Sequence, residues 1–188
     1  MRIRPLRHWE RHRLAAYYLA LPLPDRRRRF CGGVSEGFIK DYVRRLDWGR
    51  ASVFAAFEGD VIVGVVELVR PPGHWIVEAE IAISVAPGFR RQGVGAALMR
   101  AALAHARNRF LAAAYVVTAA DNRPMQALAA RFGAAFKSSF GEIEGRISLA
   151  WPGYDSLVNE AAAEGVAMLA TAFDAAPHSA GPVQPECS

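Results

Sequence analysis

The chain has 188 residues, 52% of them hydrophobic, and two distant cysteines, Cys31 and Cys187, which predicts one domain with a buried core and excludes a disulfide framework. Its formal net charge is +5, but 21 of the 23 basic residues are arginine and only Lys40 and Lys137 are lysine. We interpret this skew as a habit of genome composition, and by itself it does not indicate nucleic-acid binding.

The N-terminal segment superficially imitates a secretory signal, because the basic residues 1–13 precede the apolar stretch 14–24. Three features argue against export: Glu10 lies in the basic part, no small-x-small cleavage site follows, and the arginines at 26–29 close the segment. The apolar stretch is also too short to span a bilayer. We therefore expect a cytoplasmic protein with no membrane partner.

A strand and a helix are predicted at the start of the chain. Residues 3–6 favour a short strand, and Pro22 and Pro24 predict a break after a helix that reaches about residue 20. This helix is expected to bury Leu14, Tyr17, Tyr18 and Leu21.

A second helix is predicted over residues 35–46, "SEGFIKDYVRRL", after a possible Ser35 cap. Its apolar face consists of Phe38, Ile39, Tyr42, Val43 and Leu46. The preceding run 26–29 is typical of a solvated helix face. Because no nucleic-acid-binding signature accompanies the run, an arginine-rich nucleic-acid binder is only a third functional interpretation, which salt-sensitive retention on DNA would favour.

Three strands follow in a meander. Residues 51–57 and 61–69 are joined by a hairpin turn at residues 58–60, and the Pro-Pro-Gly turn at 71–73 leads into a strand from Trp75 to Val85. Alternation places Ile81, Ile83 and Val85 on one face of that strand and Glu80, Ala82 and Ser84 on the other.

After Gly95 the hydrophobic period becomes helical, with two stripes that predict packing on more than one side. The stripes are Val94, Leu98, Ala101 and His105, and Met99, Leu103, Ala106 and Phe110. Beyond them we predict a strand over 113–120, a helix over 123–132 and strands over 135–140 and 146–151. Residues 1–152 are thus the expected domain.

The C-terminal part is predicted to lie outside that domain. Residues 153–174 indicate an amphipathic helix that could cap the domain or pair two subunits, so a homodimer is one expected arrangement. Its apolar residues are Leu157, Val158, Ala161, Met168, Leu169, Ala172 and Phe173. Residues 175–188, rich in Pro, Ala and Ser, are typical of a disordered tail.

The turn between the predicted strand and the helix after it has the features of an anion site. The first N–H groups of a helix lack partners and lie at the positive end of its dipole. Gly93 and Gly95 carry no Cβ, so a ligand can approach the backbone, and Arg90 and Arg91 add positive charge. Phosphate is the natural ligand.

Two familiar phosphate motifs do not fit this turn. Gly88 and Gly93 have the P-loop interval, but Val94 and Gly95 stand where that loop needs Lys and Ser or Thr. In a dinucleotide-binding turn, Leu98 would occupy a position that requires Gly or Ala.

The run from Arg90 to Gly95, "RRQGVG", fits R/Q-x-x-G-x-G/A and resembles the pyrophosphate-binding motif of the GNAT superfamily of acyl-CoA-dependent N-acetyltransferases. Its surroundings are also similar to that family: Val85, Pro87, Phe89, Ala97, Leu98 and Met99. The resemblance implies an α+β fold with a mixed central sheet flanked by helices, in the order β-α-α-β-β-β-α-β-α-β-β, from Ile3 to about Trp151.

A second segment, residues 119–134, "AADNRPMQALAARFGA", resembles the part of the family in which an Asn contacts coenzyme A and the next helix lies along it. The matching positions are Asn122, Met125, Leu128 and Gly133. Together the two segments imply cofactor contacts from Ile83, Ser84, Val85, Arg90, Arg91, Gln92, Gly93, Val94, Gly95, Ala96, Asn122 and Met125. Asn122 alone could equally be a turn or cap residue before Pro124.

The resemblance is incomplete at the expected proton donor. The family commonly has a Tyr seven residues after that Asn as general acid, and this chain has Ala129. An aromatic residue usually follows the helix-ending Gly, whereas Ala134 stands here and Phe136 lies two residues further. A thiol with a pKa of about 8.5 is still a tolerable leaving group, so the missing acid slows acyl transfer without forbidding it.

A general base is needed more, because an alkyl ammonium with a pKa near 10.4 is almost fully protonated at neutral pH. Glu80 is the preferred base, since it lies on the strand where the family often places a catalytic carboxylate, and Glu78 and Glu67 are reserves. All three could instead be ordinary solvent-facing residues. The resemblance implies an oxyanion donor, a backbone N–H, near Val85. His8 and His12 have metal-ligand spacing but no evident third ligand, so no metal is expected.

The sequence therefore predicts an N-acetyltransferase that uses acetyl-CoA and passes the acetyl group directly to an amine in a ternary complex. The acceptor can be a small molecule or a protein amine. The alternative is an acyl-CoA-binding regulatory module that has lost catalysis, an interpretation that Ala129 motivates.

Overall fold

The structure is a computed structural model, and it describes residues 1–30, 32, 34–73, 77–139, 141–150 and 162. Its centre is a seven-stranded sheet in the order β1-β2-β3-β4-β5-β7-β6, in which only β4 and β5 are parallel neighbours. The strands are β1 (Arg2–Pro5), β2 (Ala51–Glu58), β3 (Val61–Val69), β4 (Glu78–Val85), β5 (Ala113–Ala119), β6 (Ala135–Ser139) and β7 (Glu142–Ser148). The predicted α+β fold with a mixed central sheet is confirmed.

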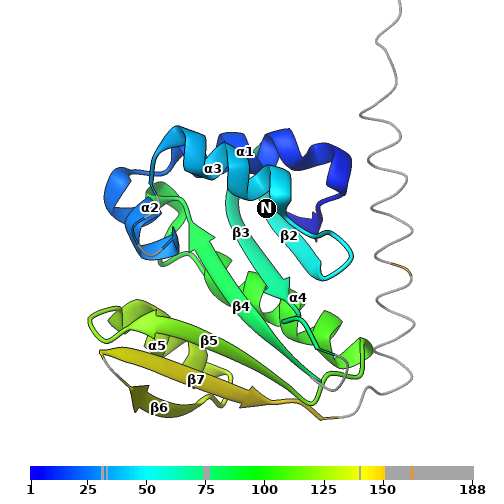
Figure 1. Cartoon of the computed structure of the whole chain (residues 1–188), viewed down its shortest axis with the longest axis vertical. Helices are drawn as coiled ribbons and strands as arrows, with labels where there is room; N and C mark the ends of the chain where they lie inside the picture. Colours follow the sequence, from blue (N-terminus) through cyan, green and yellow to red (C-terminus); the bar gives the residue numbers. More distant parts are fainter. Residues whose placement is uncertain (31, 33, 74–76, 140, 151–161, 163–188) are drawn as a thin grey trace, which may run out of the picture.

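Helices flank both faces of the sheet (Figure 1). α1 and α3 cover one face of β2 and β3, α4 covers the opposite face, and α5 lies against β5 and β7. The helices are α1 (Arg11–Ala20), α2 (Leu23–Phe30), α3 (Glu36–Arg45), α4 (Val94–Asn108) and α5 (Arg123–Arg131). No helix among the described residues has the length and apolar character needed to cross a membrane.

Gly64 on β3 lets α4 approach the sheet closely. A Cβ at Gly64 would lie 3.0 Å from a methyl carbon of Leu98 and 3.1 Å from one of Val94, closer than side chains normally pack. Val94 is the first residue of α4 and is only 3% exposed. The N-terminus of α4 is therefore fixed against the core, beside the end of β4.

The helix α2 was not among the predicted elements. Pro22 and Pro24 predict a break, but Pro24 lies in the first turn of α2, where proline costs no helical hydrogen bond. The predicted solvated face is also only half correct. Arg27 and Arg28 are exposed, whereas Arg26 donates to three carbonyl oxygens and Arg29 is largely buried.

Most other predicted elements are present, with shifted boundaries. The hairpin turn between β2 and β3 is confirmed, as is the burial of Leu14, Tyr17, Tyr18 and Leu21. The alternation of β4 is also confirmed, because Ile81, Ile83 and Val85 all pack in the core. β7 begins at Glu142, four residues earlier than predicted, and pairs there with Ser139 at the end of β6. Phe110 was placed wrongly: α4 ends at Asn108, and Phe110 follows it with φ +57° and 58% exposure.

Several predictions lie outside the described residues and stay predictions. They concern Cys31, Trp75, Trp151, Cys187, the tail 175–188 and the helix over 153–174, of which only Ala162 is described, in helical conformation.

Candidate active site

β4 and β5 pair only over their first residues and then diverge (Figure 1). The three pairs are Glu78 with Ala113, Ala79 with Ala114 and Glu80 with Tyr115. On its other side β4 remains paired with β3 as far as Val85. The sheet therefore opens at its centre, and we call this opening between β4 and β5 the gap.

The backbone of β4 directs donors into the gap. The N–H of Ala86 donates to the carbonyl oxygen of Val63 (2.9 Å), which fixes the alternation of the antiparallel ladder. Ser84 and Ala82 therefore direct their backbone groups toward β3. The intervening amides of Ile83 and Val85 face the gap, and the family resemblance implied an oxyanion donor near Val85.

An anion cradle lies at the end of the gap, formed by the amides from Arg91 to Ala96. None of these N–H groups makes a hydrogen bond of good geometry to another residue in the described part of the chain. Arg91 (φ +61°) and Gly93 (φ +82°) turn the backbone so that successive N–H groups can converge. The 15-residue helix α4 adds the positive end of its dipole behind them.

Space is left open in front of the cradle. A Cβ built on Gly93 would meet no atom within 4 Å, and one built on Gly95 would make ordinary contacts with Leu128 (3.5 Å) and Val85 (3.8 Å). The cradle thus faces the side on which α5 approaches β4. The side chains of Arg91 and Gln92 in the cradle are exposed, as is that of Arg90 just before it.

Two side chains of the motif brace the turn itself. Nε of Arg90 donates to the carbonyl oxygen of Val85 (3.0 Å), and its other end pairs with Asp25 of α2 at 2.8 Å. Gln92 donates from Nε2 to the carbonyl oxygen of Gly88 (2.8 Å). These contacts fix the turn, and Asp25 is a partner that the sequence did not reveal.

Asn122 lies at the start of α5, as both of its sequence interpretations require. Its side-chain oxygen accepts from the N–H of Met125 (3.4 Å), and its Nδ2 donates to Oγ1 of Thr118 (2.8 Å). Asn122 therefore caps the helix, and Met125 is half-buried against the core. Contacts of either residue with a cofactor stay a prediction.

Glu80 is exposed at the point where the gap begins. It shares a face of β4 with Ala82 and Ser84 and is the last residue of that strand paired with β5. Partial desolvation raises the pKa of its carboxyl group, the charge of Arg29 opposes this, and the charge of Glu67 adds to it. A carboxylate with a raised pKa beside a cleft is suited to accept a proton.

Tyr115 stands opposite Glu80 on β5 and was missed at the sequence level. Burial raises the pKa of its phenol, and the charges of Glu80, Glu144 and Glu78 raise it further. Because α4 lies between β4 and β5 in the sequence, no local spacing of residues could have predicted that Tyr115 is a neighbour of Glu80.

The two reserve bases are engaged elsewhere. Glu78 pairs with Arg146 at 2.6 Å, and Glu67 is fully buried. Glu67 accepts hydrogen bonds from the hydroxyls of Tyr18 and Tyr42 and pairs with Arg29 at 2.7 Å. The structure therefore leaves Glu80 as the carboxylate of the three that is free to receive a proton at the gap.

The buried cluster around Glu67 gives a prediction about stability. Replacing Glu67 with alanine leaves the guanidinium of Arg29 uncompensated in the interior, so we expect a loss of about 3–5 kcal/mol in the free energy of unfolding. Chemical denaturation measures this loss. Glu36→Gln is the control, because the pair of Glu36 with Lys40 is mostly exposed and should matter little. A loss below about 1 kcal/mol for Glu67→Ala would show that the cluster is not a structural anchor.

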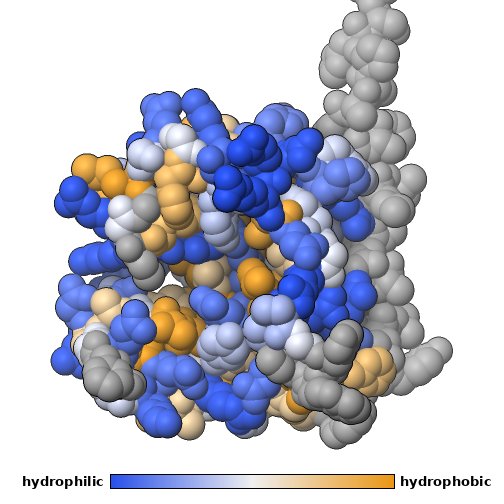
Figure 2. Space-filling view, viewed as in Figure 1, coloured by the Kyte–Doolittle hydropathy of each residue, from blue (hydrophilic) through white to orange (hydrophobic). Residues whose placement is uncertain are grey.

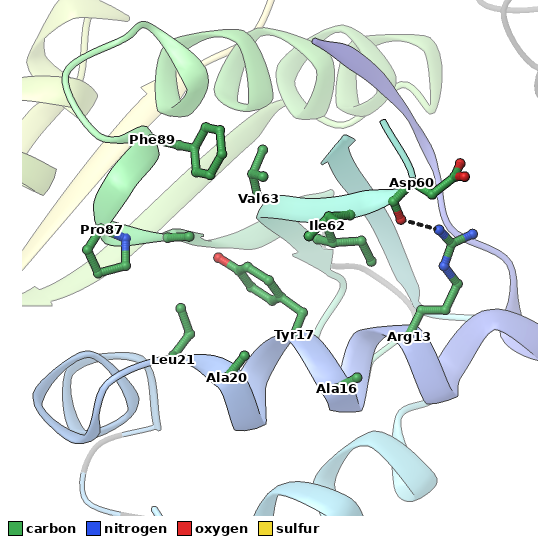
Figure 3. Close-up of a pocket in the computed structure, with 12 residues that line it drawn as sticks. Arg13, Ala16, Tyr17, Ala20, Leu21, Asp60, Ile62, Val63, Pro87 and Phe89 are labelled. Carbon is green, nitrogen blue, oxygen red and sulfur yellow. Dashed lines mark hydrogen bonds between the residues drawn. The ribbon is translucent and has the colours of Figure 1, made fainter. Parts of the chain in front are cut away.

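A separate cavity of about 460 Å³ lies between α1, the start of β3 and the segment after β4 (Figure 3). Tyr17 extends from α1 across this cavity toward the segment that carries Pro87 and Phe89. Burial raises the pKa of Tyr17 to about 12. Neither Glu80 nor any residue of the anion cradle lines the cavity, so we place neither reactant there.

A mixed sheet thus opens between two parallel strands, beside an amide cradle at a helix N-terminus. The profile described as "Acetyltransferase (GNAT) family" matches residues 15–134. The chain belongs to the GNAT acetyltransferase family. It is an acetyltransferase of that family, as the motif at Arg90 to Gly95 predicts.

Solved structures of known proteins share the fold at low sequence identity. The GNAT domain of S. lividans PAT has 23% identity and a TM-score of 0.68, over 78% of this chain and 89% of that one. The ribosomal-protein-S18-alanine N-acetyltransferase from Escherichia coli has 19% identity and a TM-score of 0.60, over 81% and 96%. PaiA N-acetyltransferase from Thermoplasma acidophilum, solved in complex with coenzyme A, has 13% identity and a TM-score of 0.58, over 78% and 98%. No curated protein sequence gives a significant match.

Proposed function

We propose that this protein transfers the acetyl group of acetyl-CoA directly to an amine acceptor while both are bound. The observation that supports this most strongly is the anion cradle, a run of amides at the gap in the sheet for which the described residues provide no acceptor of good geometry. A diphosphate is the ligand that such a cradle suits, because its oxygens can accept from several N–H groups at once.

The residues present fit acetyl-CoA. The open space at Gly93 leaves room for phosphate oxygens against the backbone, and Arg91 adds an exposed positive charge. Leu128 of α5 lies near Gly95 and Val85, so the gap has an apolar wall along which a pantetheine arm can lie. We assign diphosphate binding to Arg91 through Ala96, and contact along the gap to Ile83, Val85 and Met125.

The chemistry then divides among residues of β4. When bound, acetyl-CoA supplies a thioester with an electrophilic carbonyl carbon and a tolerable leaving group. The amides of Ile83 and Val85 face the gap and can donate to a carbonyl oxygen as negative charge develops on it. Glu80 accepts a proton from the acceptor amine, directly or through water, and so makes the amine nucleophilic.

A proton donor toward the thiolate is not supplied from α5. Ala129 stands at the position where the family commonly has Tyr, and it is 1% exposed. Tyr115 is the phenol next to Glu80 at the point where the gap begins, but its raised pKa makes it a reluctant donor. We propose that the thiolate leaves largely without acid assistance.

The test of this function is release of free thiol from acetyl-CoA. A panel should include a polyamine, an aminoglycoside, free amino acids and peptides with a free N-terminus. The proposal expects release that depends on one class of amine and is negligible without it, since the acetyl group passes directly to the amine. Release that proceeds equally without any amine would contradict direct transfer.

Ala129 also favours a second candidate, an acyl-CoA-binding regulatory module without catalysis. That module would bind acetyl-CoA but release no thiol with any member of the panel. Glu80→Gln would then change nothing measurable.

A further inference from the structure

We propose that Asp25 of α2 is a positioning residue for the cofactor site, which it serves by holding the guanidinium of Arg90 beside the anion cradle. This inference rests on the proposed function and extends it to an element, α2, that the motif does not include. The geometry that supports it is an ion pair between elements 65 positions apart in the chain, Asp25 and Arg90.

Arg90 is fixed at two points. Its Nε donates to the carbonyl oxygen of Val85 (3.0 Å), the last residue of β4, and its Nη2 lies 2.8 Å from Oδ2 of Asp25. The Asp25 side chain is 15% exposed and the Arg90 side chain 43% exposed. Asp25 is therefore mostly enclosed by protein, while much of the Arg90 side chain, next in sequence to the cradle, stays exposed.

The helix that carries Asp25, α2, is held in place by contacts of its arginine side chains. Arg26, its neighbour, donates to the carbonyl oxygens of Leu19, Leu21 and Val34. One turn further along α2, Arg29 pairs with the buried carboxylate of Glu67 at 2.7 Å. The arginine run thus ties α2 to the rest of the domain, and the position of the Asp25 carboxylate is fixed.

A guanidinium held at two points has little side-chain freedom left to lose when it meets a phosphate. A free arginine loses that freedom on binding, at a cost comparable to other immobilised long side chains. Arg90 retains donors beyond the two that Val85 and Asp25 use, because a guanidinium has five. Asp25 therefore prepares Arg90 for the anion, even though its negative charge alone would repel one.

These two effects of Asp25 have opposite signs, so Asp25→Asn separates them. If Asp25 positions Arg90, calorimetry with coenzyme A should show binding roughly threefold to tenfold weaker in the variant. The KM for acetyl-CoA should rise by a similar factor while kcat stays within about twofold of wild type. Tighter or unchanged binding would overturn the proposal, since it would mean that Asp25 only repels the anion or competes for Arg90.

A matched control exists on α3. Asp41 forms an ion pair of the same length, 2.8 Å, with Arg44, and both side chains are mostly exposed. Asp41→Asn makes the same change in net charge and should leave coenzyme A binding unchanged. A similar loss in Asp41→Asn would attribute the effect to net charge and overturn the proposal.

A double-mutant cycle shows whether Asp25 acts through Arg90. Arg90→Ala should weaken binding, and adding Asp25→Asn to it should cause no further loss. A further loss of the same size in the Arg90→Ala background would overturn the proposal, because Asp25 would then act by another route. Failure of the proposed function is distinguishable: without a cofactor site the wild type would bind no coenzyme A, and a protein that binds but does not catalyse would release no thiol while the Asp25→Asn binding comparison still holds.

Discussion

Replacing Gly93 with valine is expected to weaken acetyl-CoA binding by at least about 100-fold, equivalent to about 2.7 kcal/mol. Gly93 has φ +82°, a conformation that a β-branched residue strongly disfavours. A side chain there would also enter the open space in front of the amides, where we place the diphosphate. Calorimetry or thermal stabilisation by acetyl-CoA measures the loss.

Gly88→Ala is the control for this prediction. Gly88 belongs to the same turn, but its φ is ordinary and a Cβ there meets nothing within 4 Å. We expect the affinity of the Gly88→Ala variant for acetyl-CoA to stay within about twofold of wild type. Circular dichroism should show both variants folded. Normal binding by folded Gly93→Val would mean that the diphosphate lies elsewhere.

The second large expected effect is a loss of turnover when the proposed general base, Glu80, is replaced. Glu80→Gln is expected to lower kcat by about 10²-fold to 10⁴-fold, the usual contribution of a general base. The KM for acetyl-CoA should change little, because Glu80 is not part of the anion cradle. Glu58→Gln on the β2 hairpin is a control of equal charge change, since Glu58 lies far along the sheet and pairs with the N-terminal amine. A fall in kcat below about threefold for Glu80→Gln would exclude Glu80 as the base.

The pH dependence gives the same assignment an independent test. Glu80 must be ionised to accept a proton, so kcat/KM should fall as the pH drops through its pKa. Desolvation raises that pKa above the ordinary value of 4.5, which places the acidic limb above pH 4.5. Glu80→Gln should abolish this limb. An identical acidic limb in the variant would assign it to another group.

Local patterns predicted the parts of the site that are continuous in sequence. The switch from period two to a helical period after Gly95 predicted a strand-to-helix turn with the features of an anion site, because a strand, a tight turn and a helix are encoded by neighbouring residues. The alternation of β4 likewise predicted which side chains share a face with Glu80. Ser35 was predicted as a cap, and its Oγ accepts from the N–H of Phe38 (3.1 Å).

The missed parts depend on contacts between distant segments. The partner of Arg90 lies on α2, and the partners of Glu67 lie on α1, α2 and α3. No spacing rule in the sequence links residues so far apart. The sequence predicted Arg29 as part of a solvated face, because a run of four arginines usually is one. The structure buries Arg29 against the rings of Tyr18, Phe30 and Tyr42, with its charge balanced by Glu67.

The surface beside the candidate site is hollowed, and its polarity differs from that of the helices around it. The view in Figure 2 shows hydrophilic residues over much of the helical side and apolar residues exposed within the hollow between the two halves of the sheet. That hollow follows from the divergence of β4 and β5. Glu80, the proposed base, lies where this divergence begins, so the proposal requires the acceptor amine to enter the hollow.

Isothermal titration calorimetry of the wild-type protein with coenzyme A, at two temperatures, tests the central claim most directly. The amides from Arg91 to Ala96 predict one site per chain, with affinity that Gly93→Val removes and Gly88→Ala preserves. The absence of heat at both temperatures, or binding that is indifferent to Gly93→Val, would contradict it.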